Sequence, residues 1–151
     1  MKVKSLMLVL ILIAIVGFTA DLQMGNWKLN EAKSQHVPSM GKNLTTVFEP
    51  EGDGVRVTVD GINGDGSPRH NEWVGKFDGK DYSITGDPSA DTRAYSIVDD
   101  RTLLVTQKKN GKTTIEGTAV ISADGKTRTL TIQGKDSNGK KFEMTVVYDK
   151  Q

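Results

Sequence analysis

The chain has 151 residues, with 20 Lys and Arg against 19 Asp and Glu, no cysteine and a formal net charge of +1. Charges of both signs are scattered, which argues against nucleic-acid binding because that function needs a concentrated basic face. The lack of cysteine excludes disulfides, cysteine-based metal sites and a cysteine nucleophile.

Residues 1–20 have the three parts of a secretory signal peptide. Lys2 and Lys4 form a basic start, an unbroken apolar run follows over 6–16, and small residues form the exit. The apolar run is shorter than the roughly 20 residues that cross a bilayer. We therefore predict an exported protein, periplasmic or secreted, without an integral membrane segment after cleavage. An uncleaved N-terminal anchor is the alternative, because Phe18 stands where a small residue is preferred.

Without the signal peptide, residues 21–151 retain 18 basic and 19 acidic side chains. This length is typical of one domain, and a domain of this size can be stabilised by packing alone. We expect a single monomeric domain over residues 21–151.

Ten extended segments are predicted in this domain, each with alternating apolar and polar residues. The clearest is the segment in which Val55, Val57 and Val59 alternate with polar residues. A linker over 31–42 has room for one helical turn, and no apolar period of 3.6 residues occurs after the signal segment. In chain order the extended segments are 26–29, 44–49, 55–60, 70–77, 82–84, 94–98, 103–108, 113–121, 127–133 and 141–148.

Eight Asp-Gly or Asn-Gly pairs separate these segments or lie close to their ends. Such pairs tolerate the positive φ that both central residues of a type I′ turn require, and this turn matches the twist of a hairpin. The sequence therefore predicts hairpin after hairpin. The pairs are Asp53-Gly54, Asp60-Gly61, Asn63-Gly64, Asp65-Gly66, Asp78-Gly79, Asn110-Gly111, Asp124-Gly125 and Asn138-Gly139.

About ten sequential antiparallel strands would leave two exposed edges in an open sheet, and exposed edges pair with other chains. Closure into an up-and-down barrel removes the edges and buries one face of every strand. We therefore predict an all-β protein with an antiparallel up-and-down barrel. A two-sheet sandwich is the alternative, although it usually needs longer connections than most of these.

The start of the first segment, Gly25-Asn26-Trp27, resembles the Gly-x-Trp signature of the lipocalins and their calycin relatives. The resemblance implies a tryptophan that closes one end of the barrel and a small apolar or amphipathic ligand inside it. The stretch from Trp27 to Asn30 is also similar to the first strand of intracellular lipid-binding proteins, which are ten-stranded barrels of similar length. Those proteins usually hold a fatty-acid carboxylate with Arg-x-Tyr on the last strand. Val146-Val147-Tyr148 stands there instead, so the sequence does not support a clamp of that kind.

Successive side chains of a strand point to opposite faces, so parity identifies the polar residues that share a face with apolar ones. A hollow interior would make these residues the polar handles of an apolar pocket, and Arg128 could then pair an anionic group. Alternatively each polar side chain reaches solvent at a strand end, with Arg128 at the barrel rim and its stem packed inside. The candidate ligand-binding residues are Trp27, Asn71, Trp73, Gln107, Arg128 and Tyr148.

Motifs for catalysis, cofactors and metals are missing from the sequence. A catalytic zinc usually needs three protein ligands, whereas His70 and Glu72 form at most a two-residue partial site that is better interpreted as an exposed polar face. No Gly-x-Ser-x-Gly elbow occurs. We therefore expect no enzyme activity, no cofactor and no metal. Two functions remain: a barrel that binds a small hydrophobic or amphipathic ligand, and a solid barrel that acts through its surface as an envelope interaction or inhibitor protein.

Overall fold

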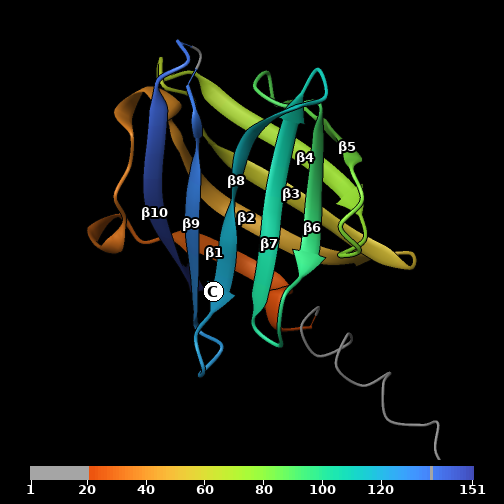
Figure 1. Cartoon of the computed structure of the whole chain (residues 1–151). Helices are drawn as coiled ribbons and strands as arrows, with labels where there is room; N and C mark the ends of the chain where they lie inside the picture. The colour runs from red at the N-terminus through yellow and green to blue at the C-terminus, as the bar shows by residue number, and fades with distance from the viewer. Residues whose placement is uncertain (1–20, 137) are drawn as a thin grey trace, which may run out of the picture.

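The computed structural model describes residues 21–136 and 138–151 as a closed barrel of ten antiparallel strands (Figure 1). Each strand pairs with its neighbours in the chain, and β1 closes the barrel against β10. This confirms the predicted fold, whereas the predicted signal peptide lies outside the described residues. The strands are β1 (Gly25–Leu29), β2 (Lys42–Glu51), β3 (Gly54–Ile62), β4 (Pro68–Gly75), β5 (Tyr82–Thr85), β6 (Thr92–Ile97), β7 (Thr102–Lys109), β8 (Lys112–Ile121), β9 (Thr127–Lys135) and β10 (Lys141–Lys150).

Alternation along the strands separates the interior from the surface, as β3 illustrates. Val55, Val57 and Val59 are buried in the core. Between them, Arg56 points outward and forms salt bridges with Glu51 on β2 and Glu72 on β4. The period of two therefore gives β3 one buried face and one face that solvent reaches.

The Asp-Gly and Asn-Gly pairs make their turns in several ways. Asn110 (φ 51°) and Gly111 (φ 73°) both have positive φ, as a type I′ turn requires. Asn110 is the one non-glycine residue with positive φ in the described part of the chain, so the type I′ prediction is wrong for the other described pairs. In the β8–β9 turn, Asp124 instead accepts a hydrogen bond at Oδ1 from the Lys126 N–H, at 3.0 Å. Another pair lies inside β3, where a Cβ on Gly61 would collide with the backbone of β2.

The linker between β1 and β2 contains two 3₁₀ turns, η1 (Glu31–Lys33) and η2 (Pro38–Met40), where one helical turn was predicted. Asn30 caps η1, because its Oδ1 accepts a hydrogen bond from the Lys33 N–H. The linker then runs along β10, to which Gln35 is joined by a bridge with Thr145. Neither these turns nor any other helix in the described residues has the length and apolar character to span a bilayer.

One end of the barrel is filled by aromatic side chains. Trp73 is fully buried, and its ring centroid lies 4.9 Å from that of Tyr95 in an edge-to-face arrangement. Its indole N–H donates to the carbonyl of Arg93 at 2.8 Å, and the N–H of the equally buried Trp27 donates to the carbonyl of Gln23 at 2.8 Å. We call this region the packed end; it comprises Trp27, Phe48, Trp73, Phe77, Tyr82 and Leu103.

Candidate functional site

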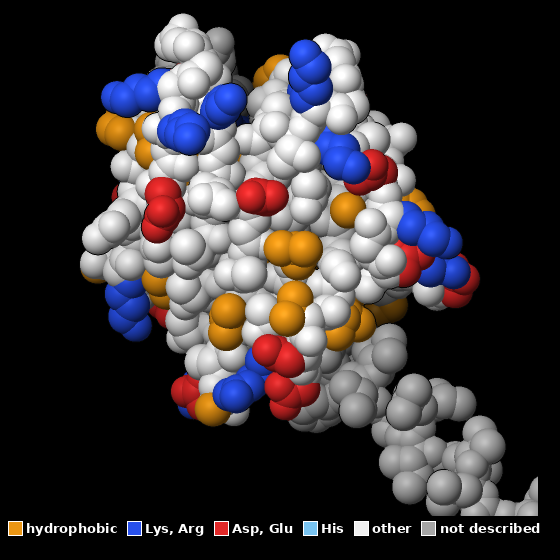
Figure 2. All heavy atoms as spheres, in the orientation of Figure 1, with side chains coloured by type: hydrophobic (Ala, Val, Ile, Leu, Met, Phe, Trp, Pro, Cys, Tyr) orange, Lys and Arg blue, Asp and Glu red, His pale blue; other side chains and the backbone are white. Residues whose placement is uncertain are grey.

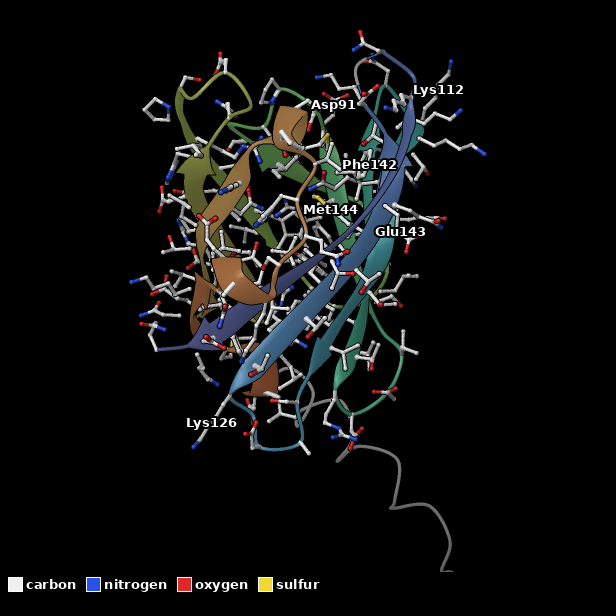
Figure 3. The ribbon with its side chains drawn as sticks, turned by 90° about the vertical axis from the view of Figure 1, so that its left-hand side faces the viewer. Asp91, Lys112, Lys126, Phe142, Glu143 and Met144 are labelled. Atoms are coloured by element: carbon white, nitrogen blue, oxygen red, sulfur yellow. The ribbon has the colours of Figure 1, made fainter. Side chains whose placement is uncertain are left out.

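The opposite end of the barrel contains a cavity of about 100 Å³, and we call this region the hollow end. In Figure 3, Asp91 and Lys112 mark the hollow end, and Lys126 marks the packed end. Phe142 and Met144 of β10 pack against the interior, while the intervening Glu143 is exposed. The apolar lining of the cavity includes Val59, Val105, Leu130, Ile132, Met144 and Val146.

Guanidinium groups outnumber carboxylates in the wall of the cavity. Arg69, Arg93 and Arg128 line it, whereas Asp87 is the one acidic residue among the lining residues. Lys42 also lies in the wall, but its ammonium group pairs with Glu31 at 2.6 Å. The side chains that line the cavity therefore carry a net positive charge.

Arg128, on β9, is the most isolated of these cations. It is 3% exposed, and none of the described carboxylates forms a salt bridge with it. Its Nε donates to Oε1 of Gln23 at 3.2 Å, and its guanidinium lies 4.9 Å from the centre of the Phe48 ring. Burial lowers the pKa of Arg128, and the nearby charge of Arg93 acts in the same direction. The alternative in which Arg128 reaches solvent at the barrel rim is wrong, because the side chain is buried and the chain around Gln23 covers it.

Arg93, on β6, is held by two neighbours. In the amide orientation that satisfies both side chains, the Gln107 oxygen accepts from Nε and Nη2 of Arg93 at 2.9 and 2.6 Å. Oδ2 of Asp87 lies 4.0 Å from the same guanidinium. Arg93 is therefore fixed in position by β7 and shares the one carboxylate of the cavity wall.

Two further polar side chains face the cavity next to these cations. Asn71, on β4, is 2% exposed, and its Oδ1 has no hydrogen-bond partner. Tyr148 lies opposite Arg128 in the β9–β10 register. Burial raises the pKa of the Tyr148 hydroxyl, although the Arg128 charge and a hydrogen bond with Thr46 oppose the shift. The phenol is therefore neutral near pH 7 and can donate a hydrogen bond.

Arg69, on β4, fastens the segments around the mouth of the cavity. Its Nη2 donates to the carbonyl of Met40 at 2.8 Å, its Nη1 to Oδ1 of Asn43 at 3.0 Å, and its Nε to Oδ1 of Asn63 at 2.9 Å. These acceptors belong to η2, β2 and the β3–β4 turn. All three are neutral, so Arg69 organises this end without being neutralised.

The structure brings four of the six predicted site residues together. Asn71, Gln107, Arg128 and Tyr148 all line the cavity. Trp27 and Trp73 do not line it, because both side chains are buried in the packed end. Parity therefore placed the polar residues on the inner face but could not say at which end of the barrel the space lies.

Sequence reasoning missed Arg93, Thr46, Arg69 and Asp87. Arg93 shares parity with Tyr95, but the predicted strand began after it, so the same argument was not extended to it. Thr46 shares parity with Phe48 in the same way. Arg69 likewise shares parity with Asn71 but stands before the start of its predicted strand, whereas Asp87 lies in a loop, where the alternation gives no signal for an inward direction.

The partial site at His70 and Glu72 lies on the outer face. Nδ1 of His70 is 2.7 Å from Asp60 and its Nε2 is 3.6 Å from Glu72, and all three side chains are exposed. The hydrogen bond with Asp60 raises the pKa of His70. No group of three or more His, Cys, Asp or Glu side chains that could hold a metal occurs in residues 21–136 and 138–151.

Comparisons with known proteins add no relative: no protein-family model matches the chain, and a search of the curated proteins found no match. The assignment therefore ends at a closed, ten-stranded antiparallel β-barrel, an architecture that is consistent with the calycins and not specific to them.

Proposed function

We propose that the protein is an exported, calycin-like barrel that binds a small amphipathic ligand in the cavity at its hollow end. One observation carries this proposal: buried polar side chains from separate strands converge on a cavity whose other walls are apolar. A few convergent polar groups in an apolar lining are typical of small-molecule sites.

Unsatisfied hydrogen-bonding capacity supports the proposal. Buried polar groups are almost always paired in folded proteins, yet Oδ1 of Asn71 has no partner and Arg128 has only a neutral acceptor among the hydrogen bonds and salt bridges of the described residues. Groups left in this way destabilise the empty barrel. A ligand that supplies the missing partners would offset that cost.

The volume of the cavity limits the size of the ligand. Typical pockets for drug-sized ligands measure roughly 300–1,000 Å³, whereas this cavity measures about 100 Å³. The ligand is therefore short, or only its head and first carbons lie inside while the rest emerges at the hollow end.

Exposed apolar side chains favour the second function, in which the protein binds a partner protein through its surface. Leu104 and Val120 are both exposed on neighbouring strands β7 and β8, and Val98 at the end of β6 is 60% exposed. Figure 2 shows apolar side chains gathered on the lower part of this face. A patch of this kind is found at protein–protein interfaces as well as on ordinary surfaces.

Isothermal titration calorimetry of the purified protein with short alcohols and carboxylates tests the proposed function. We expect saturable binding that is lost when the cavity is filled by Val105→Phe. Val120→Phe is the matched control, because it adds the same volume on the outer face and should leave binding unchanged. Binding that survives in a folded Val105→Phe variant, or no binding by any probe, would contradict the proposal.

A further inference from the structure

We propose that the ligand carries a single carboxylate, which is bound inside the barrel by Arg128 with Tyr148 as a second donor. The inference rests on the proposed function, because it names the chemical class of the molecule held in the same cavity. It differs from the clamp considered from the sequence, since the arginine comes from β9 and the tyrosine from β10.

The charges of the interior give the sign of the ligand. Asp87 lies 4.0 Å from Arg93 and is the one carboxylate of the cavity wall, so it compensates for one guanidinium. Arg128 remains without a carboxylate partner among the described residues. An isolated buried charge is strongly unfavourable unless an opposite charge accompanies it. A ligand with one negative charge would give Arg128 the opposite charge that it lacks.

The donors of the interior give the kind of anion. Arg69 uses Nε and both terminal nitrogens on neutral acceptors at the mouth of the cavity. Arg128 donates from Nε to Gln23. Neither of its terminal nitrogens donates a hydrogen bond to a described residue, and neither is among the fully enclosed atoms that lack a partner. A planar guanidinium fork with free terminal donors matches the two oxygens of a carboxylate.

The neighbours of Arg128 are arranged to keep it available. The Gln107 amide oxygen accepts two hydrogen bonds from Arg93 and so holds this second cation against β7. The hydroxyl of Tyr148, across the β9–β10 register, stays protonated because burial raises its pKa. A carboxylate beside Arg128 could therefore also accept a hydrogen bond from the Tyr148 phenol.

The apolar lining gives the direction of the rest of the ligand. From Arg128 toward the hollow end, the inward positions of β9 are Leu130 and Ile132, and those of β10 are Val146 and Met144. A hydrocarbon chain attached to the carboxylate would contact these side chains on its way to the mouth. The ligand is thus an amphiphile that enters with its head first.

Lysines at the hollow end would favour the approach of an anion. The β7–β8 and β9–β10 turns and the strand ends beside them carry Lys109, Lys112, Lys135, Lys140 and Lys141. Basic side chains are visible at this end in Figure 2. Lys109 pairs with Asp91, whereas the other four form no salt bridge with the described residues. Clustered charges of one sign raise the local concentration of oppositely charged ligands.

Calorimetric titrations with matched probes test the carboxylate. The probes are carboxylates, primary alcohols, primary amines and monoalkyl phosphates with butyl, hexyl and octyl chains. We expect the best carboxylate to bind about tenfold or more tightly than its matched alcohol, which is the effect expected of a hydrogen bond to a charged group. The amines should not bind.

Variants locate the effect. Arg128→Met should reduce the affinity for the carboxylate to that for the matched alcohol. The affinity for the alcohol should stay the same. Arg101→Met is the matched control, because Arg101 is exposed in the β6–β7 turn at the packed end, and it should retain the preference. The comparison among probes uses the unaltered protein, so it decides the question even if Arg128→Met does not fold.

Each outcome has a distinct meaning. Equal affinity for carboxylate and alcohol would overturn the carboxylate and leave the proposed function standing. Tightest binding by the alkyl phosphates would overturn the single carboxylate in favour of a more highly charged head. A preference for carboxylates that persists in a folded Arg128→Met variant would overturn the role of Arg128. If no probe binds, the proposed function fails and this inference fails with it.

Discussion

The two ends of the barrel are built from the same alternating strands but use their inward positions differently. At the packed end, Trp27, Phe48 and Trp73 fill the interior, and the indole N–H groups of the two tryptophans donate to backbone carbonyls. Next to this packing, on the side of the hollow end, Arg128 and Asn71 occupy inward positions that face the cavity. The packed end therefore supplies stability, while the hollow end carries buried polar groups that an ordinary core would exclude.

The largest effect is expected from truncation of an aromatic side chain at the packed end. Trp73→Ala removes a fully buried side chain that contacts three other rings. We expect a loss of about 3–5 kcal/mol in the free energy of unfolding, measured by urea denaturation. Val74→Ala, on the outer face of the same strand, should cost less than about 1 kcal/mol. Equal losses in the two variants would mean that the packed end does not dominate stability.

An intermediate effect is expected at the mouth of the hollow end. Arg69→Met removes three hydrogen bonds that join η2, β2 and the β3–β4 turn. We expect a loss of about 1–3 kcal/mol and faster amide hydrogen exchange in residues 38–43, with the packed end unchanged. Arg101→Met is the control. Unaltered exchange in residues 38–43 would show that Arg69 does not fasten this end.

A smaller change in stability is expected for Arg128→Met, despite the complete burial of this side chain. Relief from the burial of an uncompensated charge opposes the loss of the contacts with Phe48 and Gln23. We therefore expect the free energy of unfolding without ligand to stay within about 1 kcal/mol of the unaltered protein. A loss as large as that for Trp73→Ala would indicate that Arg128 has a structural role.

The smallest effect belongs to the outer surface. Because the hydrogen bond with Asp60 raises the pKa of His70, the titration midpoint of His70 in an NMR experiment should lie above 6.5. Any stabilisation from the charged imidazole is complete below the unfolded pKa and is lost as the pH rises through the folded pKa. Asp60→Asn should lower the midpoint. A midpoint at or below 6.5 in the unaltered protein would show that the pair is not formed in solution.

Much of the fold could be predicted from the sequence because alternation and turn residues are local signals. Val55, Val57 and Val59 identify their strand without any knowledge of its partners. The turn type was less predictable, because Asp side chains such as that of Asp124 can cap a turn without positive φ at the Asp itself.

The site was predicted only in part, because parity gives the direction of a side chain but not its depth. Arg128 looked like a residue that could reach solvent beyond its turn, yet the chain around Gln23 covers it. Which end of the barrel is filled, and which side chains are covered, depends on contacts between residues far apart in the sequence, such as that between Gln23 and Arg128. Such contacts leave no periodic signal.

The most direct test of the division into two ends follows side-chain NMR signals while hexanoate is added. We predict saturable shifts of the Arg128 Nε–Hε signal and of the Asn71 amide, with little change in the Trp27 indole signal and none at Arg101. Shifts confined to Arg101 and other surface groups, or largest at the Trp27 indole, would contradict a ligand site at the hollow end.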